Sequence, residues 1–117
     1  MNTAPGIDTN AMRQRLLARR TELEQLIESS ADTRTDRNLD QQRIGRLSRV
    51  DALQQHAMEE ATGRRREHEI ARIDAALKRI EGDDYGFCTA CERPVAPKRL
   101  ENDPATPLCI ECAARAS

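Results

Sequence analysis

Apolar residues recur at helical spacing in two stretches of the chain. In the first stretch they follow one another at steps of three, four and seven, which is the pattern of an amphipathic helix. Its apolar positions are Met12, Leu16, Leu23, Leu26 and Ile27. Asp8 or Thr9 can cap this helix at its start, and we expect it to end near Ser30. Residues 1–8 are predicted to be a flexible N-terminus.

The second stripe is longer and predicts a second helix, which begins with Asn38 as its cap. Gly63 interrupts the stripe, at a cost of about 1 kcal/mol relative to alanine. Gly82 is expected at the left-handed position that ends a helix. The apolar positions are Ile44, Leu47, Val50, Leu53, Ala57, Met58 and Ala61, and then Ile70, Ile73, Leu77 and Ile80.

Residues 31–37 separate the two stripes and have no apolar period, so they predict a connecting turn near 31–38. Two amphipathic helices joined by a short polar turn should fold back on each other. The expected fold is therefore all-α, with an antiparallel helical hairpin, or coiled coil, over residues 9–82. A small module follows over residues 83–117.

That module holds all four cysteines of the chain, as two C-x-x-C pairs separated by 17 residues: Cys88, Cys91, Cys109 and Cys112. This spacing is typical of a zinc site. Four thiolates complete a tetrahedral zinc ion and leave no coordination position open, so the site would be structural and not catalytic. The alternative is a pair of redox disulfides, which two matched pairs in a chain without a signal peptide disfavour. We expect one structural Zn²⁺.

Composition excludes several classes of protein. Hydrophobic residues make up 38% of the chain and charged residues 33%, so a compact core filled with apolar side chains is not expected. Metal binding can supply folding free energy where burial cannot. The net charge of −1 argues against a dedicated duplex-DNA binder, and one tyrosine and one phenylalanine are too few for a base-stacking surface. No apolar run reaches membrane-spanning length. No signal peptide follows the first residue, so we expect a cytoplasmic location.

The short sequence motifs around the cysteines resemble the zinc-finger region of the DksA/TraR family. They are Asp-Asp-Tyr-Gly-Phe-Cys over 83–88, Lys-Arg-Leu-Glu over 98–101, Pro104, and Leu-Cys-Ile-x-Cys over 108–112. The resemblance implies a transcription regulator that binds bacterial RNA polymerase directly and does not recognise promoter DNA by sequence. It further implies that the coiled-coil tip enters the polymerase secondary channel to modulate initiation, often together with the nucleotide ppGpp.

The family's acidic tip motif, D-x-x-D-x-A, does not occur in this sequence. The carboxylates that we expect at the tip are Asp36 and Asp40, with Asp32 and Asp51 as further candidates; helix capping or a solvated face is the alternative role for each. An acid at Asp103, where a phosphate-binding surface would favour a base, makes a response to ppGpp doubtful.

Two other functions compete with this one. A zinc-stabilised adaptor would bind another protein or nucleic acid through its helices, using the arginines of the stripe Arg43, Arg46 and Arg49. An enzyme is disfavoured because the chain has no open metal position, no Ser-His-Asp set and no phosphate-binding loop. The sequence leaves the oligomeric state open.

Overall fold

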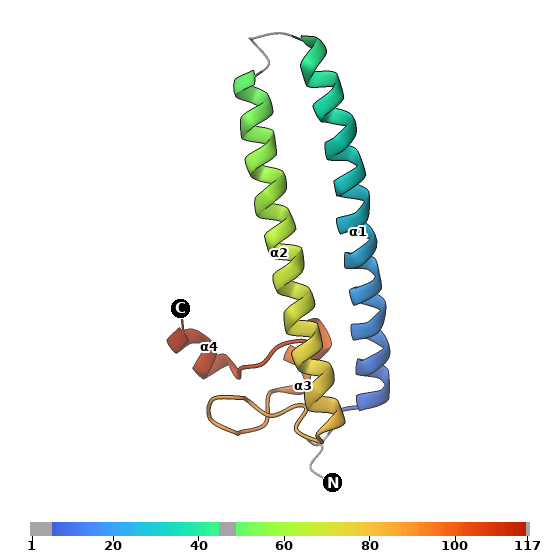
Figure 1. Ribbon diagram of the computed structural model, residues 1–117. Coiled ribbons are helices and arrows are strands. Elements are labelled where there is room, and N and C mark those ends of the chain that lie inside the picture. The colour runs from blue at the N-terminus through green and yellow to red at the C-terminus, as the bar shows by residue number, and fades with distance from the viewer. Residues whose placement is uncertain (1–5, 45–48, 117) are drawn as a thin grey trace. The chain divides into compact units, whose positions relative to one another are not determined.

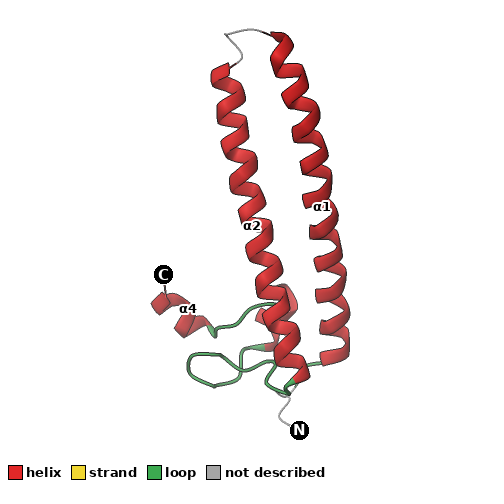
Figure 2. Cartoon of the chain, in the orientation of Figure 1, coloured by secondary structure: helices red, strands yellow, loops and turns green. Residues whose placement is uncertain are grey.

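The computed structural model describes residues 6–44 and 49–116, and the side chains of 6–30 and 50–116. This part of the chain contains the helices α1 (Thr9–Ile44), α2 (Arg49–Glu81), α3 (Pro97–Asn102) and α4 (Ile110–Ala116) (Figure 1). It has no strand; Phe87 and Pro94 form one isolated antiparallel bridge (Figure 2). The predicted all-α fold is confirmed.

The start of α1 agrees with the sequence prediction. The backbone N–H of Ala11 donates to the Asp8 carboxylate at 3.2 Å, and that of Met12 donates to the Asp8 carbonyl at 3.1 Å. Asp8 is therefore the cap, because its side chain satisfies an N–H group that has no partner within the helix.

The predicted turn at 31–38 is wrong, because α1 continues through these residues to Ile44. The second helix accordingly begins at Arg49 and not at Asn38. The segment 31–44 is polar but contains neither glycine nor proline. Polar residues remove the apolar period without preventing helical backbone geometry, whereas glycine and proline disfavour it directly.

The chain forms two compact units, and both long helices contribute to each unit. Unit 1 holds α1 up to Arg20, and α2 from Ile70 together with everything after it. Unit 2 consists of residues 21–69. The residues after 82 were predicted to form a module of their own. They lie in the same unit as the beginning of α1 and the end of α2.

The core of unit 1 joins three parts of the chain. Burial of each large apolar side chain there is worth about 1.5–3 kcal/mol. Buried residues come from α1, from one face of α2, and from the segment after α2: Met12, Leu16, Ile73, Ala76, Ile80, Tyr85, Cys88, Val95, Leu100 and Ala105. Thr106 is the one buried polar side chain of the described residues. The apolar stripe of α2 is thus a packed seam in this unit.

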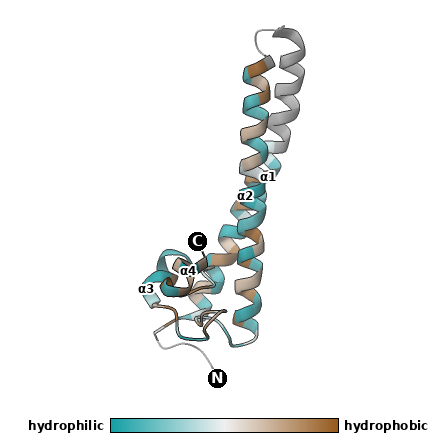
Figure 3. Cartoon of the chain, turned by 90° about the vertical axis from the view of Figure 1, so that its left-hand side faces the viewer, coloured by the Kyte–Doolittle hydropathy of each residue, from teal (hydrophilic) through white to brown (hydrophobic). Residues whose placement is uncertain are grey.

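Unit 2 is less well packed on the α2 side. Leu23 of α1 is buried, with 1% of its surface exposed, but Leu53 and Met58 of α2 are each 69% exposed. Arg66 links the two helices, since its Nη1 donates to the Ser30 hydroxyl at 2.8 Å and to the Leu26 carbonyl at 3.3 Å. Figure 3 shows bands of hydrophobic and hydrophilic residues alternating along α2.

Helix α2 runs without a break across Gly63 and ends in a Schellman motif. The N–H of Asp84 donates to the Arg79 carbonyl at 2.8 Å, and the N–H of Asp83 donates to the Ile80 carbonyl at 3.3 Å. Asp83 takes the left-handed conformation, with φ of 60°, so it occupies the position expected for Gly82.

None of the described helices is both long enough and apolar enough to cross a membrane.

Candidate metal centre

The first cysteine pair lies on a tight turn that follows the Schellman motif. The N–H of Val95 donates to the Gly86 carbonyl and that of Cys88 to the Arg93 carbonyl, both at 2.8 Å. Inside this ladder the N–H of Glu92 donates to the Cys88 carbonyl at 2.9 Å, and Glu92 has φ of 65°. This left-handed residue reverses the chain directly after the second cysteine of the pair.

The second cysteine pair follows a short helix and a proline-rich segment. Helix α3 begins with Pro97, whose missing N–H is not needed at this position, and ends where Asp103 becomes extended. Arg99 Nε then donates to the Leu108 carbonyl at 3.0 Å, and the Thr89 N–H donates to the Pro107 carbonyl at 2.9 Å. These bonds hold the second pair beside the turn that carries the first.

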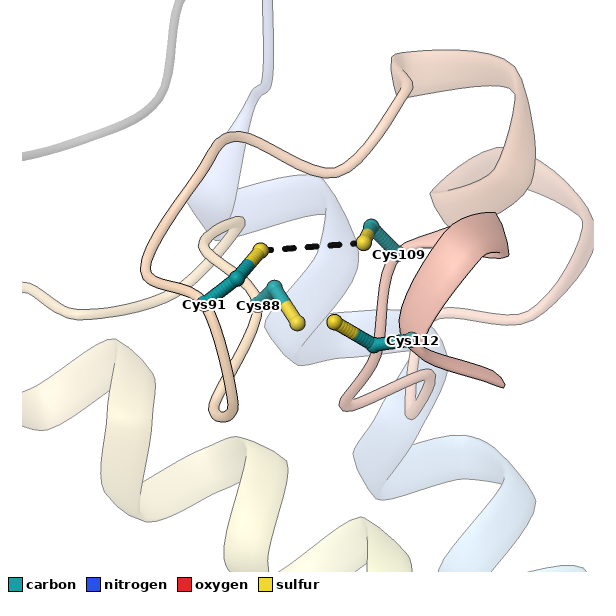
Figure 4. A group of neighbouring side chains, drawn as sticks. All are labelled: Cys88, Cys91, Cys109 and Cys112. Carbon is teal, nitrogen blue, oxygen red and sulfur yellow. Dashed lines mark hydrogen bonds between the residues drawn. The ribbon is translucent and has the colours of Figure 1, made fainter. Parts of the chain in front are cut away.

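The four sulfur atoms converge on one point (Figure 4). They all lie within 4.8 Å of one another, and the Sγ atoms of Cys91 and Cys109 are 3.7 Å apart. A tetrahedron with Zn–S bonds of about 2.3 Å requires sulfur–sulfur distances of about 3.8 Å. No disulfide joins the four cysteines. The geometry therefore fits a four-thiolate zinc ion and disfavours the pair of redox disulfides.

The surroundings favour ionised sulfur at Cys88 and Cys109 but not at Cys112. Backbone N–H groups of Cys109 and then Cys91 direct hydrogen bonds to the Cys88 sulfur and lower its pKa to about 6. A backbone hydrogen bond from Cys112 similarly lowers the pKa of Cys109. The pKa of Cys112 is raised to about 12 because its proton is shared first with Cys109 and then with Cys88. N–H groups aimed at sulfur are the usual means of stabilising the net charge of a zinc–thiolate site.

Two arginines bind the zinc module to the helices of unit 1 and a third joins the two helices to each other; sequence reasoning found none of them. Arg15 Nη2 donates to the Glu101 carbonyl at 2.7 Å, and Arg72 Nη2 lies 2.8 Å from the Asp103 carboxylate. Arg20 Nε lies 2.8 Å from the Asp74 carboxylate and joins α1 to α2. No periodicity marks these pairs, because their members are far apart in the chain.

The charge of Asp103 is stabilised by its contacts. Burial alone would raise the pKa of this carboxyl group, but the hydrogen bond and charge of Arg72 hold it below its ordinary value. Thr106 and the N–H of Ala105 add further hydrogen bonds to the same carboxylate. The carboxylate of Asp103 is thus ionised and already paired with the guanidinium group of Arg72.

The expected tip carboxylates belong to the two long helices and not to the segment that carries the cysteines. Asp51 lies in the first turn of α2 and is exposed. Asp32, Asp36 and Asp40 belong to α1, and their side chains are outside the described residues. Arg43, Arg46 and Arg49 of the predicted basic stripe are also outside the described side chains.

Comparison with known proteins agrees with this architecture. Residues 83–117 match the family described as "Prokaryotic dksA/traR C4-type zinc finger". A protein named RNA polymerase-binding transcription factor DksA, from Haemophilus influenzae, is 39% identical over 54 residues. The protein of the same name from Escherichia coli K12 is 40% identical over 43 residues.

These two matches cover 45% and 37% of this chain, but only 37% and 28% of the relatives. The chain thus spans about a third of the length of the curated relatives that it matches. The likeness of fold reaches further. The structure of transcription factor DksA2 from Pseudomonas aeruginosa superposes with a TM-score of 0.76 and 28% identity, over 92% of this chain and 81% of that one.

The zinc-finger match and the converging thiols together establish one structural zinc site, as the sequence predicted. The resemblance that the sequence indicated is also confirmed: residues 83–117 match the C4-type zinc finger of the DksA/TraR family.

Proposed function

We propose that this protein is a transcription regulator that binds bacterial RNA polymerase directly and modulates initiation. The observation that carries the proposal is the fold likeness to DksA2 over 92% of the chain, combined with the zinc-finger match over residues 83–117. Two curated relatives are named for binding RNA polymerase. In this role the protein acts through protein–protein contact, is not an enzyme and works in the cytoplasm.

The part of the chain that we propose to enter the secondary channel is the connection between α1 and α2. Helix α1 ends at Ile44 and α2 begins at Arg49, so this connection falls within residues 45–48. Asp51 is two residues into α2, and Asp40 is four residues before the end of α1. These bounds favour Asp40 and Asp51 as tip carboxylates, while Asp32 and Asp36 lie at least eight residues before the end of α1.

The zinc module supports this function structurally. We propose that Cys88, Cys91, Cys109 and Cys112 are the four ligands, which the convergence of their sulfur atoms supports. Zinc would fix the two turns relative to each other and leave no position for a substrate. The packing of Tyr85, Val95 and Leu100 in the core of unit 1 would then hold the module on the helices.

We further propose that the protein neither responds to ppGpp nor recognises DNA by sequence. Asp103 is acidic and is already paired with Arg72, so neither residue offers a free cation for a phosphate group. The net charge of −1 provides no basic excess for the phosphates of a duplex.

The test combines polymerase binding with transcription initiation in vitro, for the wild-type protein and the double variant Asp40→Asn/Asp51→Asn. We expect the variant to bind but to lose its effect on initiation, because each substitution removes a charge and keeps the size of the side chain. Asp83→Asn is the matched control, since asparagine tolerates the left-handed conformation of this exposed position. An unchanged effect of the double variant would contradict the assignment of the tip.

A further inference from the structure

A groove lies on the surface of the zinc module, between the first cysteine turn, α3 and the start of α4. Its volume is about 520 Å³. It is lined by the side chains that the following argument uses: Arg93, Pro94, Lys98, Arg99, Ile110 and Glu111. All belong to unit 1, and none belongs to the predicted hairpin tip.

The groove carries an excess of positive charge. Three of its residues are cations and one, Glu111, is an acid. Glu111 offsets Arg93 only weakly, because the two charged groups are 4.0 Å apart and both side chains are largely exposed. Lys98 has no ion pair within the described part of the chain. The groove therefore favours an anionic partner.

An apolar surface accompanies these charges. Ile110 is 71% exposed, the most exposed of the large hydrophobic residues in the described part of the chain. Pro94 lines the same groove and presents a rigid apolar ring. An aliphatic side chain of a partner could cover Ile110 while flanking carboxylates meet Lys98 and Arg93.

We propose that this groove binds a short acidic peptide segment of a partner protein, with an aliphatic side chain on Ile110 and carboxylates paired to Lys98 and Arg93. A nucleic acid fits less well. No aromatic side chain is among those lining the groove, so bases would have no stacking surface, whereas the exposed Ile110 suits an aliphatic side chain. The inference does not depend on polymerase binding, because it concerns a different surface.

The same cations have another conceivable role, which is to offset the negative charge of the zinc–thiolate site. The two roles predict different results. If the cations served only the metal, reversing their charge would increase zinc release and leave peptide binding without a specific dependence on Lys98.

The experiment measures fluorescence anisotropy of a labelled peptide in which one leucine is flanked on each side by two glutamates. The zinc-loaded full chain is titrated as wild type and as Lys98→Glu, Arg93→Glu and Ile110→Ala. Arg65→Glu is the matched control, because it makes the same charge change at an exposed site on α2, outside the groove. Zinc content and helical circular dichroism of each variant are recorded in parallel.

We expect Lys98→Glu and Arg93→Glu each to weaken binding by about tenfold. Ile110→Ala and replacement of the leucine by serine should each weaken it by about threefold or more, and Arg65→Glu should leave it unchanged. Absence of wild-type binding would overturn the proposal, and so would equal losses with Arg65→Glu. Stronger binding of a thymidine oligonucleotide of similar length would replace the peptide by a nucleic acid, and would also overturn it.

Discussion

The hydroxyl group of Tyr85 donates a 2.7 Å hydrogen bond to the carbonyl oxygen of Pro104. Tyr85 comes just before the first cysteine pair and Pro104 before the second, so the bond ties together the two segments that lead into the metal centre. Tyr85 is 1% exposed. Burial raises its pKa from an ordinary value of 10.0 to about 12, an effect that the nearby Arg79 charge reduces.

The raised pKa of Tyr85 predicts that the folded protein loses stability at high pH. Its pKa in the folded state is raised, so the neutral hydroxyl contributes its full stabilisation below pH 10 and loses it as the pH rises from 10 to 12. Tyr85 is the only tyrosine of the chain, so absorbance at 295 nm reports it alone. We expect a midpoint near pH 12 in the folded protein and near 10 in urea.

The matching variant is Tyr85→Phe. It removes the donor to the Pro104 carbonyl and keeps the ring, so we expect the free energy of unfolding to fall by roughly 1–3 kcal/mol. Urea denaturation at pH 7 measures this change. A folded-state midpoint near pH 10, together with an unchanged stability of the variant, would show that the hydroxyl is not bonded as described.

Removal of zinc should unfold the module after Gly82. Structural zinc supplies an apparent folding free energy of about 10–16 kcal/mol in zinc-finger peptides at pH 7. We expect one zinc per chain by mass spectrometry, and loss of the dispersed amide resonances of residues 83–116 after chelation. Cys91→Ser should have the same effect, while Ala90→Ser, an exposed change within the same C-x-x-C turn, should retain the metal. Full zinc retention by Cys91→Ser would contradict the four-thiolate assignment.

The Arg72–Asp103 pair should make a small contribution to stability. Its atoms are 2.8 Å apart, but the side chains are 35% and 47% exposed, so solvent screens the attraction. A double-mutant cycle with Arg72→Ala and Asp103→Asn should give a coupling of no more than about 1 kcal/mol, which falls as salt is added. The Arg20–Asp74 pair has the same 2.8 Å separation and similar exposure, and is the reference cycle. A coupling of several kcal/mol, insensitive to salt, would refute this account.

Gly63 offers a site at which the helix can be stabilised. It lies inside α2, and a Cβ atom there would have no neighbour within 4 Å. We expect Gly63→Ala to increase the free energy of unfolding by about 1 kcal/mol, since alanine restricts the unfolded chain and favours helix. Gly86→Ala should act in the opposite direction, because Gly86 has φ of 92°. Equal effects of both variants in urea denaturation would contradict the helical geometry at Gly63.

The sequence could predict the metal centre because its signal is local. The spacing of the four cysteines reports a fixed chemistry, and only two short turns have to form for the sulfur atoms to converge. The buried stripe of Ile73 and Ile80 was likewise predictable, since helical periodicity and burial in unit 1 coincide there.

The connection between the helices was not predictable from periodicity alone. Polar residues after Ser30 end the apolar stripe, but backbone propensity and not hydrophobicity decides where a helix stops. The better signal was the first glycine after Ser30, Gly45, which directly follows the last residue of α1. The pair Arg72–Asp103 could not be predicted either, because only the folded chain brings residues so far apart in sequence into contact.

The measurement that tests the proposed function most directly is a binding titration of the zinc-loaded protein against purified bacterial RNA polymerase, with and without a known ligand of the secondary channel. Binding at micromolar concentration that the channel ligand abolishes is the predicted result. The groove variant Lys98→Glu is titrated as a second sample. Because the groove is a different surface, this variant should bind polymerase as the wild type does even if the groove proposal fails. No binding at micromolar concentration, or binding that the channel ligand leaves unchanged, would contradict the account.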